Sequence, residues 1–224
     1  FEHLVPLPAD GNMEQLLQAQ QLGTVIYASK RLPSVEGKNV VVIGQGSAGL
    51  WFNFYLRRLG AKKIVAVDIE AYRLERSRLF GADGICHNSE QDPEACVRSE
   101  FDGELADLVV EAAGEVDSIN LASGLVRKFG EILFFGYPRS QTFAFQFDRF
   151  YQKCCRATTI VGASDEVGLA SMHEAVGLVA SGEADAKSLI THRVGLDDVL
   201  DAYEMHRTRS DGAVKIVIEM PGAG

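Results

Sequence analysis

Residues 40–49 read Val-Val-Val-Ile-Gly-Gln-Gly-Ser-Ala-Gly, an apolar β-branched run followed by glycines in the spacing G-x-G-x-x-G. The apolar run predicts a parallel strand that is covered on both faces. The following residues predict a helix that ends at Gly60. In this context the first glycine permits a tight turn, the second admits a phosphate to the backbone, and the third lets the helix pack closely. The stretch therefore predicts a phosphate-binding turn.

An acidic residue, Asp68, ends the next apolar run, residues 64–67. A carboxylate there can accept both hydroxyls of an adenosine ribose. The 2′-phosphate of NADP would instead meet a like charge, which costs on the order of 4 kcal/mol at about 4 Å and an effective dielectric near 20. The glycine loop and Asp68 together predict a site for NAD(H).

Two alternatives to a dinucleotide site remain open. A glycine-rich turn can join a strand and a helix without binding a ligand, with Asp68 acting only as a helix cap. Methyltransferases that bind S-adenosylmethionine also combine a glycine loop with an acidic residue. The full glycine spacing and the strand order favour the dinucleotide site.

Strands and helices alternate along the chain. The apolar runs predict strands near Ile85 and over residues 108–110, 132–135 and 159–161, and helices over residues 13–30, 71–80 and 116–129. Such alternation predicts an α/β fold, a doubly wound parallel sheet of six strands (a Rossmann fold). After Gly162 the pattern changes to helices over 165–181 and 197–207 and a strand over 214–218, a short C-terminal helix–strand appendage.

Composition excludes several classes of protein. The net charge of −9 argues against a nucleic-acid partner. No apolar run approaches the length of a membrane span. The cysteines, at 86, 96, 154 and 155, have no C-x-x-C spacing. A domain of this size needs no disulfides, so we expect free thiols and a cytoplasmic location.

Short motifs along the chain point to one enzyme family. They lie at residues 37–44, 67–68, 80–83, 110–114, 135–138, 189–192 and 212–218. In this order and spacing they resemble the C-terminal half of the medium-chain, zinc-dependent alcohol/polyol dehydrogenases, over nearly the whole chain. The resemblance implies hydride transfer between the carbinol of a small alcohol and a nicotinamide cofactor.

The resemblance also implies cofactor contacts beyond the glycine loop. Arg73 matches a basic residue beside the adenosine ribose, and Lys215 one that reaches the pyrophosphate. Residues 112–114 match a loop on the adenosine side, and residues 135–137 one that holds the nicotinamide carboxamide. The predicted cofactor residues are Gly44, Gln45, Gly46, Ser47, Ala48, Gly49, Asp68, Ile69, Arg73, Ala112, Ala113, Gly114, Phe135, Gly136, Tyr137 and Lys215.

The family's catalytic groups are not recognised in this chain. In the family an N-terminal domain carries two zinc ligands and the proton relay, and nothing here corresponds to it. The third ligand usually lies on the helix before the glycine loop, where residues 15–20 are only Leu, Gln and Ala and Glu14 comes slightly too early. We therefore expect no metal site in this chain, although the full-length enzyme can use zinc, and we assign no catalytic residue.

The resemblance divides the chain into three parts. Residues 1–30 are a segment left over from a missing N-terminal catalytic domain, 31–164 the NAD-binding domain, and 165–224 helices and a strand that return toward the catalytic domain. We expect no turnover without the missing domain. The alternative is a non-catalytic module for NAD binding and dimerisation. The family also implies a homodimer through the last sheet strand, near Thr158–Gly162.

Overall fold

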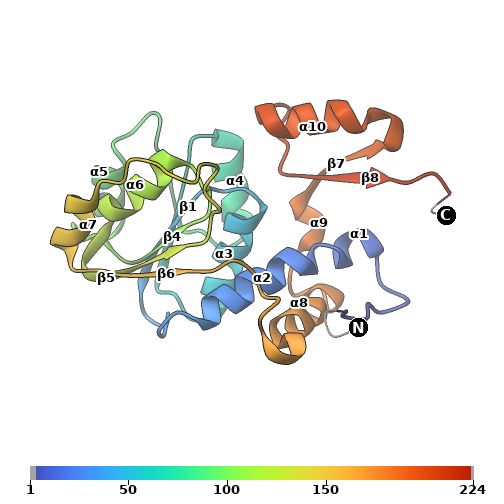
Figure 1. The fold of residues 1–224 in the computed structure, drawn as a ribbon, viewed down its shortest axis with the longest axis horizontal. Coiled ribbons are helices and arrows are strands. Elements are labelled where there is room, and N and C mark those ends of the chain that lie inside the picture. The colour runs from blue at the N-terminus through green and yellow to red at the C-terminus, as the bar shows by residue number, and fades with distance from the viewer. Residues whose placement is uncertain (1–3, 223–224) are drawn as a thin grey trace. The chain divides into compact units, whose positions relative to one another are not determined.

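A computed structural model describes residues 4–222 of the chain. They form two compact units (Figure 1). The sheet unit is Val25–Ala163, and the terminal unit combines the residues up to Thr24 with those from Ser164 onward. Both ends of the chain therefore belong to the same unit, and helix α2 (Ala19–Lys30) runs across the boundary in sequence.

The sheet unit contains six parallel strands in the order β3-β2-β1-β4-β5-β6. They are β1 (Asn39–Ile43), β2 (Lys63–Asp68), β3 (Gly84–His87), β4 (Ala106–Glu111), β5 (Val126–Phe134) and β6 (Arg156–Thr159). The strand order reverses where β1 and β4 lie side by side. The predicted doubly wound six-stranded sheet is confirmed.

Helices cover both faces of this sheet (Figure 1). One layer is α3 (Ser47–Arg58) and α4 (Ala71–Leu79), and the other is α5 (Pro93–Glu100), α6 (Val116–Leu125) and α7 (Phe147–Lys153). Consecutive strand residues point to opposite faces, and Val40, Val41 and Val42 are all 0% exposed. The two helical layers explain why the central strands are apolar throughout.

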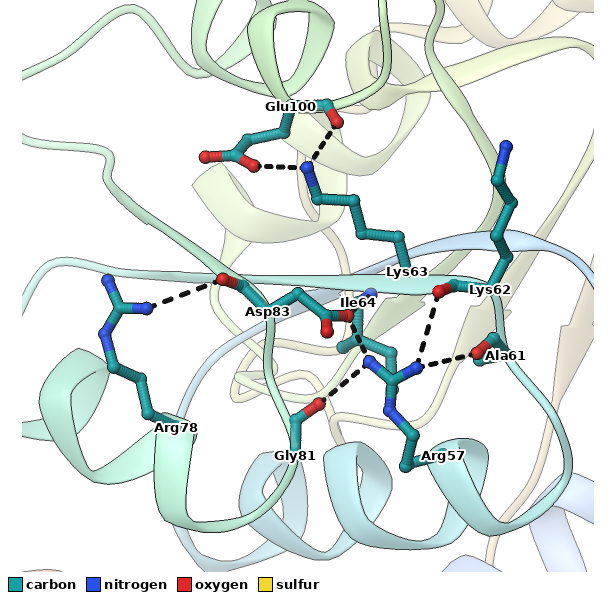
Figure 2. Close-up of polar contacts among 9 residues, drawn as sticks. All are labelled: Arg57, Ala61, Lys62, Lys63, Ile64, Arg78, Gly81, Asp83 and Glu100. Atoms are coloured by element: carbon teal, nitrogen blue, oxygen red, sulfur yellow. Dashed lines mark hydrogen bonds and ion pairs between the residues drawn. The ribbon is translucent and has the colours of Figure 1, made fainter.

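Hydrogen bonds and ion pairs close the sheet at the amino ends of β2 and β3 (Figure 2). Arg57 of α3 donates to the carbonyls of Ala61 at 2.9 Å and Gly81 at 3.2 Å, and forms an ion pair with Asp83. The Asp83 carboxylate also accepts the N–H of Ile64 at 2.7 Å. These contacts tie the end of α3 to the starts of two strands.

A second ion pair lies at the same end of the sheet (Figure 2). The ammonium of Lys63, the first residue of β2, lies 2.7 Å from the carboxylate of Glu100 on α5. It also donates to the Glu100 carbonyl at 2.7 Å. We call the side chains of Arg57, Lys63, Asp83 and Glu100 the amino-edge cluster.

The terminal unit is mostly helical. It contains α1 (Met13–Leu16), the 3₁₀ turns Val167–Leu169 and Leu196–Asp198, α8 (Ala170–Ala180), α9 (Ala186–Leu189), α10 (Val199–Thr208) and a parallel pair, β7 (Ile190–Gly195) and β8 (Lys215–Glu219). Glu14 on α1 pairs with Arg193 on β7 at 2.7 Å. No helix within residues 4–222 is long and apolar enough to cross a membrane, and the four cysteines are free.

Several predicted element boundaries are wrong. The helix predicted over 116–129 ends at Leu125, because Val126 has extended backbone and pairs with Ala106 of β4. Phe129, in the same segment, has a φ of 62° and cannot continue a helix. The sixth strand ends at Thr159 rather than covering 159–161. The helix predicted over 13–30 is divided into α1 and α2.

Helices α5 and α7 were missed in the sequence. For α5 the signals are present: Asp92 caps it by accepting the N–H of Ala95 at 3.1 Å, and Pro93 occupies its first turn. Helix α7 ends at Cys154, which has a left-handed backbone with a φ of 49°. A non-glycine residue in that conformation gives no sequence signal for a helix end.

Candidate functional site

The glycine loop lies between β1 and α3 at the carboxyl edge of the sheet. Gly44 has a φ of +90°, and a Cβ there would lie 2.8 Å from the Cβ of Ala113. A Cβ on Gly49 would lie 1.8 Å from the Gly44 carbonyl oxygen. A Cβ on Gly46 would meet no described heavy atom within 4 Å. The first and third glycines are therefore required by the protein's own packing, whereas the second faces open space.

The amino end of α3 faces the same space. The helix begins at Ser47, and its N-cap residue, Gly46, has no side chain to cap it. Gly46, Ser47 and Ala48 are partly exposed. The first N–H groups of a helix have no partner within the helix, and they lie at the positive end of its dipole. This arrangement suits a phosphate.

Asp68, the last residue of β2, is joined to the glycine loop. Its Oδ2 accepts the N–H of Gln45 at 2.5 Å, and its Oδ1 accepts the N–H of Glu70 at 2.9 Å. The residue is 7% exposed. Each carboxylate oxygen has two lone pairs, so both can still accept a hydroxyl. The acid is thus held in one orientation by the loop itself.

The side chain of Gln45 points into the protein. Its Nε2 donates to the Val42 carbonyl at 2.8 Å, and its Oε1 accepts from Nδ2 of Asn53 at 2.7 Å. The residue is 0% exposed. Because Asp68 occupies its N–H, Gln45 acts on the site by orienting the loop and the acid.

Ile69 and Arg73 follow Asp68 at the same edge of the sheet. The Ile69 side chain is 44% exposed, unusual for an isoleucine. Arg73, on α4, donates from Nε to the Tyr72 hydroxyl at 3.0 Å, and its guanidinium carbon lies 5.6 Å from the centre of that ring. Tyr72 therefore helps to orient the Arg73 side chain.

Glu111, the last residue of β4, organises the loop that follows it. Its Oε1 accepts the N–H groups of Ala113 at 2.8 Å and Gly114 at 2.9 Å, and the hydroxyl of Ser118 at 2.8 Å. Burial raises the pKa of this carboxyl above its ordinary value, and the three hydrogen bonds lower it in part. Sequence reasoning included Glu111 in a family motif but gave it no role; the available signal was an acid ending an apolar strand.

The loop after β5 packs against the loop after β4. A Cβ on Gly114 would lie 2.5 Å from the carbonyl oxygen of Tyr137, and one on Gly136 would lie 2.2 Å from the Gly114 nitrogen. The Phe135 ring packs edge-on against the buried ring of Phe52, with centroids 4.8 Å apart. The two predicted cofactor loops are therefore in direct contact.

An apolar cavity of about 340 Å³ borders the loop after β5. It is lined by Ile119, Phe134, Phe135, Gly136, Tyr137, Pro138, Phe143, Phe145, Thr159, Ile160 and Val161. Cavities of this size and character bind flat or apolar groups of small molecules.

The predicted residue Lys215 lies in the terminal unit, at the start of β8. Its N–H donates to the hydroxyl of Thr191 at 3.3 Å. Burial lowers the pKa of its ammonium, and no described acid pairs with it. The other fifteen predicted residues lie in the sheet unit, and those from Gly44 to Tyr137 gather at the carboxyl ends of β1, β2, β4 and β5.

The described residues contain no group of three or more His, Cys, Asp or Glu side chains placed to hold a metal ion. Glu14, the acid nearest to the position of the family's third zinc ligand, forms its ion pair with Arg193. The described residues therefore form no complete zinc site of their own.

Comparison with known proteins identifies the family. Residues 48–181 match the model of the family described as zinc-binding dehydrogenase. The matched range includes Asp68, both cofactor loops and the last two residues of the glycine loop, Ala48 and Gly49. The chain belongs to the zinc-binding dehydrogenase family. The predicted resemblance is thereby confirmed.

Relatives in this family include polyol dehydrogenases. The chain is 29% identical over 217 residues to a protein named D-xylulose reductase A from Aspergillus oryzae, covering 95% of this chain and 58% of that protein. It is 27% identical over 226 residues to sorbitol dehydrogenase 1 from Saccharomyces cerevisiae, covering 98% of this chain and 62% of the relative. The chain thus spans about 60% of the length of these curated relatives.

A solved alcohol dehydrogenase has the same fold. The structure of the alcohol dehydrogenase TADH from Thermus sp. ATN1 superposes with a TM-score of 0.81 at 27% identity, covering 96% of this chain and 60% of that one. The Rossmann architecture is therefore shared with an alcohol dehydrogenase of known structure.

Proposed function

We propose that this chain is the NAD(H)-binding part of an alcohol/polyol dehydrogenase. The observation that carries the proposal is the bond between Gln45 N–H and the Asp68 carboxylate, which couples a phosphate-binding turn to a ribose-binding acid. The two groups lie on neighbouring strands at the carboxyl edge, beside the point where the strand order reverses. Dinucleotides bind at such switch points in open α/β sheets.

The predicted residues that face the site have distinct roles in this proposal. The N–H groups of Gly46, Ser47 and Ala48 bind the pyrophosphate, and Asp68 accepts the adenosine ribose hydroxyls. Ile69 covers one side of the adenine with its exposed side chain, and Arg73 lies beside the ribose. Residues 112–114 line the adenosine side. For Lys215, which belongs to the terminal unit, a contact with the pyrophosphate is what the resemblance to the family implies.

The nicotinamide end lies against the loop after β5. Backbone groups of Phe135, Gly136 and Tyr137 bind the carboxamide, and the neighbouring cavity offers an apolar surface to the ring. A bound nicotinamide would accept the hydride of a carbinol carbon or return a hydride to the corresponding carbonyl carbon. This chain determines the position and the surroundings of the nicotinamide. We assign ionisation of the alcohol to the part of the enzyme that this chain does not span. The relatives named for xylulose and sorbitol support a polyol or other small alcohol as the substrate.

Cofactor titration tests the proposal. We expect NADH to bind the chain at least tenfold more tightly than NADPH, because Asp68 repels a 2′-phosphate. Asp68→Ser should bring the two dissociation constants to within about threefold of each other. Both are measured by the fluorescence of bound reduced nicotinamide. The absence of saturable NADH binding, or an unchanged NADH/NADPH ratio in Asp68→Ser, contradicts the proposed site.

An activity assay distinguishes the cofactor-binding part of an enzyme from a non-catalytic NAD-binding module. We expect no turnover of a panel of alcohols and polyols by this chain alone, with or without added zinc. Saturable NADH binding without turnover is also the behaviour of a non-catalytic NAD-binding module. Restoring oxidation by joining the chain to the N-terminal domain of a polyol dehydrogenase relative would identify it as the cofactor part of an enzyme.

We also propose a homodimer through the β6 edge, near Thr158–Gly162. Strand β6 pairs with β5 on one side and lies at the end of the strand order. The side chain of Val161, just beyond it, is 92% exposed, and Tyr137 nearby in the same cavity lining is 81% exposed. Edge strands bordered by exposed apolar residues readily pair with another chain. The proposal of this contact also rests on the resemblance to the family, which implies a dimer through the last sheet strand.

A further inference from the structure

Glu111 connects the two loops of the candidate site. Its carboxylate accepts two N–H groups from the loop at residues 112–114 and the hydroxyl of Ser118. Its carbonyl oxygen accepts the N–H groups of Phe135 and Gly136, both at 2.9 Å. The side chain therefore fixes the loop after β4, while the main chain of the same residue fixes the loop after β5.

This carboxyl group is fully buried, since Glu111 is 0% exposed. Its Oε2 has no hydrogen-bond partner among the described residues, and a Cβ on Gly136 would lie 2.7 Å from it. Burying a carboxyl is costly, and an apolar residue in its place would leave the N–H groups of Ala113 and Gly114 without an acceptor. The effect of this buried carboxyl group is therefore on the geometry of the loop, because it supplies the acceptor for these N–H groups.

We propose that Glu111 is a positioning residue for the dinucleotide, which acts by holding the loops at 112–114 and 135–137 against each other. It does not need to touch the cofactor. The inference rests on the proposed NAD(H) function. It adds a residue outside the predicted cofactor contacts that determines how well the preformed site binds.

Two substitutions at Glu111 test this role. Glu111→Ala removes the acceptor for all three side-chain bonds, and we expect the dissociation constant of NADH to rise at least tenfold. Glu111→Gln keeps an oxygen acceptor of the same reach, and we expect its dissociation constant to stay within threefold of the unmodified chain. Equal binding by Glu111→Ala and the unmodified chain contradicts the inference.

Glu131 on β5 provides a matched control. It is also buried, at 5% exposed, and burial also raises its pKa. Its Oε2 also has no hydrogen-bond partner among residues 4–222 and lies 3.9 Å from the guanidinium of Arg156. It pairs in register with Leu108 and Arg156, three positions before the carboxyl end of β5 at Phe134. Glu131→Ala should leave NADH affinity unchanged. An equal loss of NADH affinity in Glu131→Ala and Glu111→Ala would show that the loss comes from general destabilisation, and would overturn the inference.

Amide hydrogen exchange measures directly how well the loop at residues 112–114 is held. Exchange at Ala113 and Gly114 should be faster in Glu111→Ala than in the unmodified chain and unchanged in Glu111→Gln. If Glu111→Ala does not fold, Glu111→Asp, shorter by one methylene, should show both effects. Failure of the unmodified chain to bind NADH contradicts the proposed function together with this inference. Normal NADH binding by the Ala or Asp variant contradicts this inference alone.

Discussion

Charged side chains at the two edges of the parallel sheet have different partners. At the amino edge, Arg57 and Asp83 bind each other and neighbouring backbone groups, as do Lys63 and Glu100 (Figure 2). At the carboxyl edge, Asp68 and Glu111 bind backbone N–H groups of loops. The amino edge satisfies its charges internally, whereas the carboxyl edge uses its charges to shape loops around open space.

This difference separates stability from binding. Charges at the amino edge join a helix end to strand starts and pair with one another. The carboxyl edge combines an uncapped helix start at Gly46 with a fixed acid and two interlocked loops. Substitutions at the first edge should therefore change folding, and well-chosen substitutions at the second should change binding alone.

The largest effects are expected within the glycine loop. Gly49→Ala places a Cβ 1.8 Å from the Gly44 carbonyl oxygen, so we expect a loss of unfolding free energy of about 3 kcal/mol together with the loss of NADH binding. Gly46→Ala meets no described atom within 4 Å and has a φ of −70°. Its stability should be unchanged, while NADH affinity falls at least about tenfold because charged hydrogen bonds to phosphate are weakened.

Urea unfolding and NADH titration of both glycine variants measure these effects. A Gly46→Ala chain that binds NADH normally would break the comparison, because the open space at this edge would then not be the pyrophosphate site.

A smaller effect is expected at the amino-edge cluster. Arg57→Met removes hydrogen bonds to Ala61 and Gly81 and the ion pair with Asp83. Because the ion pair is more than a third exposed, we expect a loss of unfolding free energy of only about 1–2 kcal/mol. NADH affinity should not change, as measured by the same titration.

Lys62→Met is the control for this substitution. Lys62 offers only its carbonyl to Arg57, and its side chain points away from the cluster (Figure 2). The control should lose no more than about 0.5 kcal/mol. A fall in NADH affinity in Arg57→Met but not in Lys62→Met would show that the two edges are coupled.

At the β6 edge the expected effect is on the oligomeric state. Val161→Glu places a charge on the proposed dimer contact, and we expect a shift from dimer to monomer in analytical ultracentrifugation. Val167→Glu is the matched control, because Val167 is also highly exposed, at 96%, but belongs to the terminal unit. A monomeric unmodified chain, or equal effects of the two substitutions, would contradict the β6 contact.

Much of the carboxyl edge was readable from sequence because its roles are local. The glycine spacing defines the turn, and Asp68 follows an apolar strand directly. Glu111 was not given a role, because its hydrogen bonds depend on where two loops meet, and its main-chain partners Phe135 and Gly136 lie far along the sequence. The end of α6 was misplaced for the same reason: Val126 leaves the helix to pair with Ala106, a contact that the local sequence does not signal.

Hydrogen exchange of the unmodified chain with and without NADH tests the central claim most directly. We predict slower exchange on NADH addition at the carboxyl edge, in the segments 44–49, 68–69, 112–114 and 135–137. Exchange at the amino edge, in segments 57–63 and 81–83, should stay the same. Protection confined to the amino edge, or no protection at the carboxyl edge at saturating NADH, would contradict the account.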